Sequence, residues 1–128
     1  MQKVALVVDD SMLIRYALCR FLQERGFKVE SASNGKEALD VVDRVRPDLV
    51  VTDMQMRQMS GTELITALKS RPDTENVPII LVASKSTGST AEKRANFTIC
   101  KDIDIDAQLG KALDALMGDA GKGQAAGK

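Results

Sequence analysis

Histidine is absent from this chain of 128 residues, and cysteine occurs only twice. The lack of histidine excludes Ser-His-Asp triads, histidine general bases and most zinc sites. Cys19 and Cys100 are far apart in the sequence, and each lies in an apolar stretch. We therefore interpret both as small buried hydrophobic residues rather than as a disulfide or a redox pair.

Long apolar runs and a net charge are missing as well. The N-terminal run 4–8 has five apolar residues, whereas a signal peptide needs about 7–15 and a membrane helix about 20. The chain has 18 basic residues (lysine and arginine) and 18 acidic residues (aspartate and glutamate), so its formal net charge is zero. It therefore has no overall positive field that would attract nucleic acid or an anionic membrane. We expect a cytoplasmic protein without nucleic-acid or membrane partners, in which any charge that matters is local.

The remaining composition is that of an ordinary globular domain, with 44% hydrophobic and 28% charged residues. A length of 128 residues suits one domain with a core of its own. Residues 118–128 are rich in glycine and alanine, which is typical of a flexible tail. We therefore predict one domain over residues 1–117, followed by this tail.

Short apolar segments alternate with helical patterns along the domain. Short segments with apolar residues predict strands at 4–8, 27–31, 48–53, 79–83 and 97–101, of which 4–8 and 79–83 are apolar throughout. Apolar residues at helical spacing predict helices between Ser11 and Gly26, at 38–45, between Gly61 and Arg71, and at 105–116. This (βα)5 order predicts a parallel sheet with helices on both faces.

Two connecting segments have the composition of turns and loops. Asn34-Gly35 is interpreted as a turn. Residues 84–96 are rich in serine, threonine and glycine, so we expect a loop with at most a short helix at 91–96.

Charged residues stand where several of the predicted strands end. Asp9 and Asp10 follow the first strand, Asp53 ends the third and Lys101 ends the fifth. Parallel strands place these ends at one edge, where the carboxylates repel one another unless a cation compensates them. Mg²⁺ prefers oxygen ligands, and a carboxylate beside Mg²⁺ and a lysine is a plausible nucleophile for a phosphoryl group. A single aspartate at a strand end is usually a solvated terminus or a helix cap, but the combination favours a site.

Several of these segments together resemble the receiver domain of two-component response regulators. The matching parts are "VVDDS" (7–11), "NGKEAL" (34–39), "PDLVVTDMQM" (47–56), "VPIILVAS" (77–84), Arg15, Gly61 and Lys101. The resemblance covers the chain up to about residue 117 and is closest to the single-domain chemotaxis receivers. It implies a flavodoxin-like fold with a five-stranded parallel sheet in the order 2-1-3-4-5.

The resemblance also implies a role for each of the charged residues at the strand ends. Asp53 corresponds to the phosphoryl acceptor, and Lys101 to the lysine that pairs with the phosphoryl group. Asp10, Asp53 and the backbone carbonyl of Gln55 correspond to ligands of Mg²⁺, with Asp9 acting through water. The donor would be a phosphohistidine on a histidine kinase or a phosphotransfer protein. The domain would assist its own phosphorylation and dephosphorylation without being an enzyme in the usual sense.

The chain departs from the family pattern where the phosphorylation state is normally transmitted. The usual threonine or serine at the end of the fourth strand is replaced by Ala83. Ser84 is one residue late and should face the other side, so it could substitute only if the strand ends early or bulges. The usual switch aromatic is replaced by Thr98, and the neighbouring Phe97 should face the opposite way.

The segment leading to Lys101 departs from the pattern too. The interval from Ala83 to Lys101 is about one helical turn short, so a helix within 84–96 would be short, displaced or mobile. Asp102 replaces the proline that usually follows the lysine, and a cis peptide without proline costs about 2.5–4 kcal/mol, so we expect a trans bond. Arg57 also replaces a usual proline, and it either faces solvent or reaches an acid or a partner at the site mouth.

Three functions remain open from the sequence. The first is a stand-alone receiver, a monomer or weak dimer, that is phosphorylated on Asp53 and signals by binding a downstream protein. The second is a pseudo-receiver that keeps the fold and binds partners regardless of phosphorylation. The third is a small metal-dependent phosphohydrolase, although "VVDDS" lacks the Asp-x-Asp spacing of aspartate-nucleophile phosphatases and the chain is short for a substrate cap.

Overall fold

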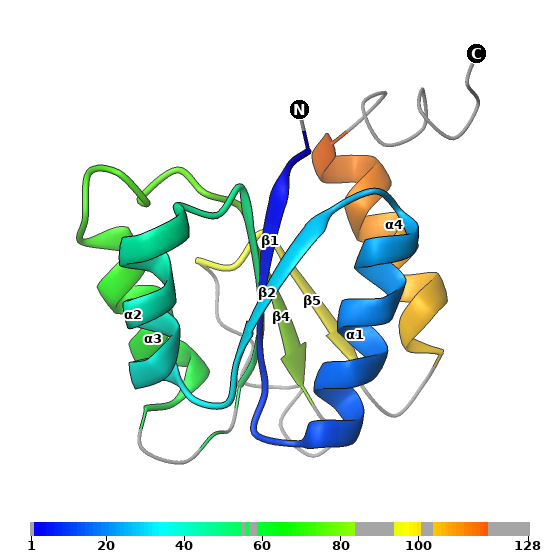
Figure 1. The fold of residues 1–128 in the computed structure, drawn as a ribbon, viewed down its shortest axis with the longest axis horizontal. Coiled ribbons are helices and arrows are strands. Elements are labelled where there is room, and N and C mark those ends of the chain that lie inside the picture. Colours follow the sequence, from blue (N-terminus) through cyan, green and yellow to red (C-terminus); the bar gives the residue numbers. More distant parts are fainter. Residues whose placement is uncertain (1, 55, 57–58, 84–93, 101–103, 118–128) are drawn as a thin grey trace.

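The structure is a computed structural model that describes residues 2–54, 56, 59–83, 94–100 and 104–117. Figure 1 shows its strands and helices, coloured along the sequence from blue at the N-terminus to red at the C-terminus. The strands are β1 (Val4–Val8), β2 (Lys28–Ala32), β3 (Leu49–Asp53), β4 (Ile79–Ala83) and β5 (Phe97–Cys100). The helices within the described ranges are α1 (Met12–Glu24), α2 (Gly35–Val45), α3 (Gly61–Lys69) and α4 (Ile105–Met117).

The strands form one sheet in the order β2-β1-β3-β4-β5, and every neighbouring pair is parallel. This confirms the predicted flavodoxin-like sheet and its strand order. The helix that we expected to be short within 84–96 falls mostly on residues 84–93, which lie outside the described residues. The part of it that is described, residues 94–96, leads into β5 without a helix.

Helices cover both faces of the sheet, with α1 and α4 on one face and α2 and α3 on the other (Figure 1). Successive strand residues alternate between the two faces. In β3, Val51 packs in the cluster with α1 and α4, whereas Val50 packs in the cluster with α2 and α3. All five residues of β3 are buried, which explains why the strand begins with three apolar residues in a row. No helix in the described part of the chain is both long and apolar enough to cross a membrane.

Side-chain caps fix the starts of three helices. The Ser11 hydroxyl accepts a hydrogen bond from the Ile14 backbone N–H at the start of α1, and Ser60 and Glu63 form a capping box at the start of α3. Asn34 caps α2 in the same way, because its side-chain oxygen accepts from the Glu37 backbone N–H at 2.8 Å. The predicted turn at Asn34-Gly35 was therefore wrong, since Gly35 is the first residue of α2.

Arg46 ends α2 in the left-handed conformation, with φ 49° and ψ 74°. Such a backbone strains a residue with a Cβ, whereas glycine adopts it freely. The arginine gains an exposed ion pair with Asp73 at 3.5 Å, which is worth little in solvent. We expect Arg46→Gly to raise the free energy of unfolding by about 0.5–1 kcal/mol, as measured by urea denaturation. Arg44→Gly, inside the exposed face of α2, should instead lower it by about 1 kcal/mol, and equal losses in both variants would contradict this explanation.

Candidate functional site

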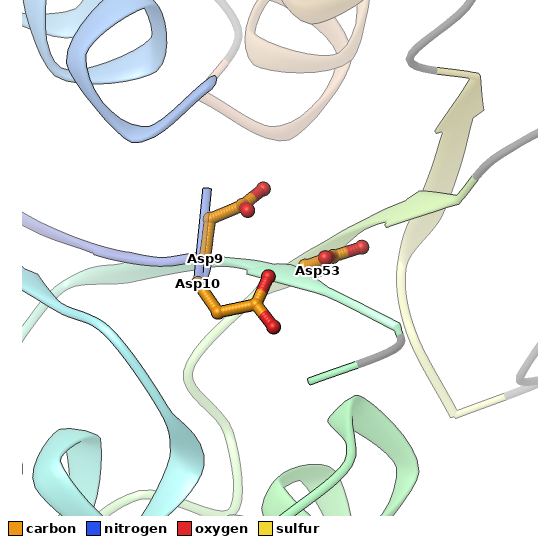
Figure 2. A group of neighbouring side chains, drawn as sticks. All are labelled: Asp9, Asp10 and Asp53. Carbon is orange, nitrogen blue, oxygen red and sulfur yellow. The ribbon is translucent and has the colours of Figure 1, made fainter. Parts of the chain in front are cut away.

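Three carboxylates meet at the edge of the sheet where β1 and β3 end. The pairing of Val8 with Thr52 brings the following residues, Asp9 and Asp53, side by side. One carboxylate oxygen from each of Asp9, Asp10 and Asp53 lies within 4.8 Å of the others. Figure 2 shows the three side chains together, with Asp9 and Asp10 at the end of β1 and Asp53 at the end of β3. The predicted convergence of these acids is confirmed.

The turn after β1 holds Asp9 in a fixed orientation. Its Oδ1 accepts a hydrogen bond from the Ser11 backbone N–H at 2.8 Å. Its backbone carbonyl accepts from the Arg15 guanidinium at 2.7 Å. Asp9 is fully buried, whereas Asp10 is exposed. The turn therefore places one acid inside the protein and the next at the mouth of the site.

Asp53 is the last residue of β3, and only 3% of it is exposed. The Thr52 hydroxyl donates to the Asp53 carbonyl at 3.0 Å. The ladder continues beyond the strand, because the Met54 N–H donates to the Val82 carbonyl and the Gly61 N–H donates to the Met54 carbonyl, at 3.0 and 2.8 Å. The backbone that carries Asp53 is thus held by β4 on one side and by the start of α3 on the other.

The donor set of this cluster fits a hard divalent cation. Two of its carboxylates are buried, and charged acids at such short distances in a low-dielectric site repel each other. A cation coordinated by their oxygens removes that repulsion, and Mg²⁺ prefers a site with one or two carboxylates and room for water. The exposed Asp10 leaves the site open toward solvent. The geometry therefore suits Mg²⁺ and an entering phosphate oxygen.

The chain was compared with known families, curated proteins and solved structures. Residues 5–113 match the response regulator receiver domain. The chain belongs to this family. Domains of the family accept a phosphoryl group on an aspartate and bind Mg²⁺ in an acidic pocket.

Individual relatives of this receiver are moderately similar in sequence. The response regulator MprA of Mycolicibacterium vanbaalenii is 39% identical over 84 residues, which is 66% of this chain and 36% of MprA. The receiver thus spans about a third of the length of the curated relatives that it matches. The chemotaxis response regulator CheY4 of Vibrio cholerae is 27% identical with a TM-score of 0.80, over 90% of this chain and 98% of CheY4. TrrA of Thermotoga maritima, solved in complex with Mg(2+)-BeF, is 31% identical with a TM-score of 0.78, over 90% of this chain and all of TrrA (100%).

The positions that usually switch in a receiver lie on β4 and β5, one at the last residue of β4 and the other at the second residue of β5. Ala83 is buried at the end of β4 and has no hydroxyl to offer to a phosphoryl group. Thr98 is exposed on β5, and Phe97 packs on the opposite face in the cluster with α1 and α4. The predicted opposite orientation of Phe97 is confirmed, because Phe97 packs, partly buried, against the cluster with α1 and α4 and so lies on the other face of the sheet from Thr98.

Several predicted site residues fall on parts of the chain that the structure does not describe. These are Gln55, Arg57, Ser84, Lys101 and Asp102. Their assigned roles stay predictions from the family resemblance.

Glu37 and Arg15 form a second charged group near the turn that carries Asp9 and Asp10. The Glu37 carboxylate accepts from both the backbone N–H and the hydroxyl of Ser33, each at 2.7 Å. These two hydrogen bonds, together with the positive charge of Arg15, hold the pKa of Glu37 below its usual value. Arg15 therefore lies between the turn that carries Asp9 and the start of α2, where it donates to the Asp9 carbonyl and its positive charge acts on Glu37.

The structure also shows two features that the sequence analysis missed. Met12, Leu13 and Tyr16, in the first turns of α1, are 73%, 81% and 62% exposed. Gln108 of α4 makes hydrogen bonds to the backbone of Cys100 at the end of β5. Neither has a clear signal in the sequence, because apolar residues at the start of a helix usually face the core and a glutamine in a helix usually faces solvent.

Proposed function

We propose that this receiver accepts a phosphoryl group on Asp53 from a phosphohistidine of a histidine kinase or phosphotransfer protein. The observation that carries the proposal is the buried Asp53, whose carboxylate lies within 4.8 Å of those of Asp9 and Asp10. The receiver would then signal through protein–protein contacts, as a monomer or weak dimer. Residues 1–117 form the receiver in this proposal, and residues 118–128 are not needed for phosphorylation.

The chain's own residues account for the transfer step. An oxygen of the Asp53 carboxylate attacks the phosphorus, and the P–N bond to the donor imidazole breaks as the new P–O bond forms. The leaving imidazole takes up a proton, and Asp53 becomes an acyl phosphate. Lys101 is assigned to pair with a phosphoryl oxygen. Asp10, Asp53 and the Gln55 carbonyl, with Asp9 through water, are the groups that would hold Mg²⁺, which would supply positive charge beside the transferring group.

A protein donor is supported by the surface beside the acidic turn. Met12, Leu13 and Tyr16 expose apolar side chains directly after the residues that carry two of the acids. Exposed apolar groups next to a reactive site are typical of surfaces that bind a protein. A partner that covers this part of α1 would therefore bring its phosphohistidine to the mouth of the acceptor site.

In this proposal, a partner does not detect phosphorylation through the hydroxyl of the fourth strand and the switch aromatic that receivers usually use. Ala83 has no hydroxyl to reach the phosphoryl group, and Phe97 packs, partly buried, against the core cluster on the face covered by α1 and α4. A partner would therefore sense the phosphoryl group at the site mouth instead of through a distant aromatic side chain.

The test is phosphorylation of the purified chain by acetyl phosphate, recorded by intact mass. We expect a single phosphoryl adduct with Mg²⁺ and none with EDTA, because the charge of the transferring group is then uncompensated. Absence of any adduct, together with no response to beryllofluoride, would favour the pseudo-receiver. Continuous turnover of a phosphomonoester would favour the hydrolase.

A further inference from the structure

The backbone leaves the sheet within the turn that carries Asp9 and Asp10. The strand β1 ends at Val8, and the Asp9 N–H still donates to the Ala32 carbonyl at 3.1 Å, in continuation of the pairing with β2. The Asp9 carbonyl accepts from a side chain, because Nη1 of the Arg15 guanidinium donates to it at 2.7 Å. One anchor of the peptide unit between Asp9 and Asp10 is therefore a side chain of α1.

This peptide unit affects the directions of two of the three acids. A peptide unit is planar, so a rotation of its carbonyl changes ψ of Asp9 and φ of Asp10 together. The Ser11 N–H, which holds Oδ1 of Asp9 at 2.8 Å, follows on the same backbone. The carboxylate oxygens of the cluster lie within 4.8 Å of one another, and Mg²⁺ demands near-ideal octahedral geometry. A hydrogen bond that fixes this peptide unit thus fixes how well the acids match a cation.

Arg15 is itself held by the structure around it. Its backbone N–H donates to the Ser11 carbonyl at 2.9 Å in the first turn of α1. Its side chain is half-buried, and its positive charge acts on Glu37 at the start of α2. Glu37 in turn accepts two hydrogen bonds from Ser33, each at 2.7 Å. The guanidinium therefore links α1, the start of α2 and the turn after β1.

We propose that Arg15 is a positioning residue for the cation site. Its hydrogen bond to the Asp9 carbonyl holds the peptide unit in the orientation in which Asp9 and Asp10 can share one cation with Asp53. The inference rests on the proposed function, in which these acids hold Mg²⁺. Arg15 acts through the backbone and not by contact with the cation. Groups that orient the ligands of a metal typically change its affinity about 10–100-fold when they are removed.

A positioning role and a purely electrostatic role of Arg15 predict opposite changes. The positive charge lies close to Asp9, so its removal alone would make Mg²⁺ bind more tightly. Loss of the hydrogen bond frees the peptide unit, so Mg²⁺ would bind more weakly. Arg15→Met keeps the aliphatic stem and loses every donor, and we expect its dissociation constant for Mg²⁺ to rise about tenfold. Unchanged or tighter binding would overturn the proposal.

The experiment is a Mg²⁺ titration of the full chain, followed by amide chemical shifts without any phosphodonor. Arg15→Lys keeps a cationic donor on a long stem, so it should bind Mg²⁺ within about threefold of the wild type. Arg20→Met is the matched control, because Arg20 is an exposed residue of the same helix and pairs with Glu24 at 3.6 Å. It should bind Mg²⁺ like the wild type. Equal losses of affinity in Arg20→Met and Arg15→Met would contradict a role of the Asp9 contact.

The metal-free chain gives a second readout that does not depend on Mg²⁺. Amide exchange of the Ser11 N–H should become faster in Arg15→Met, because the backbone that presents this N–H to Asp9 is released. Exchange at Val51, inside β3, should stay the same, and an unchanged rate at Ser11 would refute the restraint. If Arg15→Met does not fold, Arg15→Gln takes its place. The glutamine donor is two bonds shorter and falls short of the carbonyl, so wild-type Mg²⁺ affinity in Arg15→Gln would also refute the proposal.

The fate of this inference can be told apart from that of the proposed function. If the wild-type chain binds Mg²⁺ and takes up a phosphoryl group while Arg15→Met binds Mg²⁺ equally well, the inference is wrong and the proposed function stands. If the wild-type chain binds no Mg²⁺, the cation site of the proposed function fails and the inference fails with it.

Discussion

Asp53→Asn is expected to take up no phosphoryl group from acetyl phosphate under conditions in which the wild-type chain is fully modified. A carboxamide oxygen carries no charge, so it is a much weaker nucleophile and cannot form an acyl phosphate. The substitution keeps the shape of a side chain that is only 3% exposed, and the Asp53 backbone contacts to Thr52 do not depend on the carboxylate. Intact mass measured over time gives the result directly, and we expect complete loss of the adduct.

The matched control is Asp48→Asn. Asp48 directly precedes the same strand at the opposite edge of the sheet, and its carboxylate accepts from the Val4 N–H at 2.8 Å, which an asparagine oxygen can also do. This variant should be phosphorylated at the wild-type rate. An adduct that persists in Asp53→Asn would assign the acceptor to another carboxylate, and peptide mapping of Asp9 and Asp10 would then locate it.

The fold could be predicted to the extent that burial leaves a pattern in the sequence. β1 and β4 are covered on both faces, so their residues form uninterrupted apolar runs that are easy to recognise, and the first three residues of β3 form a shorter run of the same kind. The strand order, in contrast, came from the family resemblance, because periodicity does not tell which strands are neighbours. β2 begins at Lys28, one residue later than predicted, and its mixed burial gives a weaker pattern.

The acidic cluster could be predicted because it follows from topology. Once the sheet is parallel, residues that directly follow β1 and end β3 must meet, and Asp9 and Asp53 do so through the register of Val8 with Thr52. Asn34 was misassigned for a chemical reason. The same side-chain oxygen that favours asparagine in turns also caps helices, and only the bond to the Glu37 N–H decides between the two.

Hydrogen bonds from a side chain to the backbone of another element could not be predicted from a pattern in the sequence. Arg15 reaches the Asp9 carbonyl across one turn, and Gln108 reaches Cys100 only because α4 packs beside the edge strand. Each depends on the placement of two elements and not on a pattern within one. The sequence could therefore name the acids, and Arg15 through the family resemblance, but not the backbone groups that Arg15 and Gln108 contact.

Gly61→Ala is expected to destabilise the domain and to slow phosphorylation. A Cβ on Gly61 would clash with the Asp53 carbonyl oxygen and lie 2.9 Å from the Met54 Cα, both of which are backbone atoms that cannot rotate away. The Gly61 N–H also donates to the Met54 carbonyl, so α3 cannot withdraw without breaking that bond. We expect the free energy of unfolding to fall by about 1–3 kcal/mol in urea, even though alanine is the better helix former.

Gly110→Ala is the control that separates a close approach from helix propensity. A Cβ there would lie 2.9 Å from the Arg25 Nη2, the far end of a flexible side chain that can move aside. This variant should be as stable as the wild type, or more stable by up to about 1 kcal/mol, because alanine is favoured inside α4.

The Gly61 variant should also lose phosphorylation rate at a temperature where it remains folded, since any shift of the Asp53 backbone moves the acceptor. Wild-type stability and rate in Gly61→Ala would mean that the Asp53 backbone can move away from α3 without moving the acceptor.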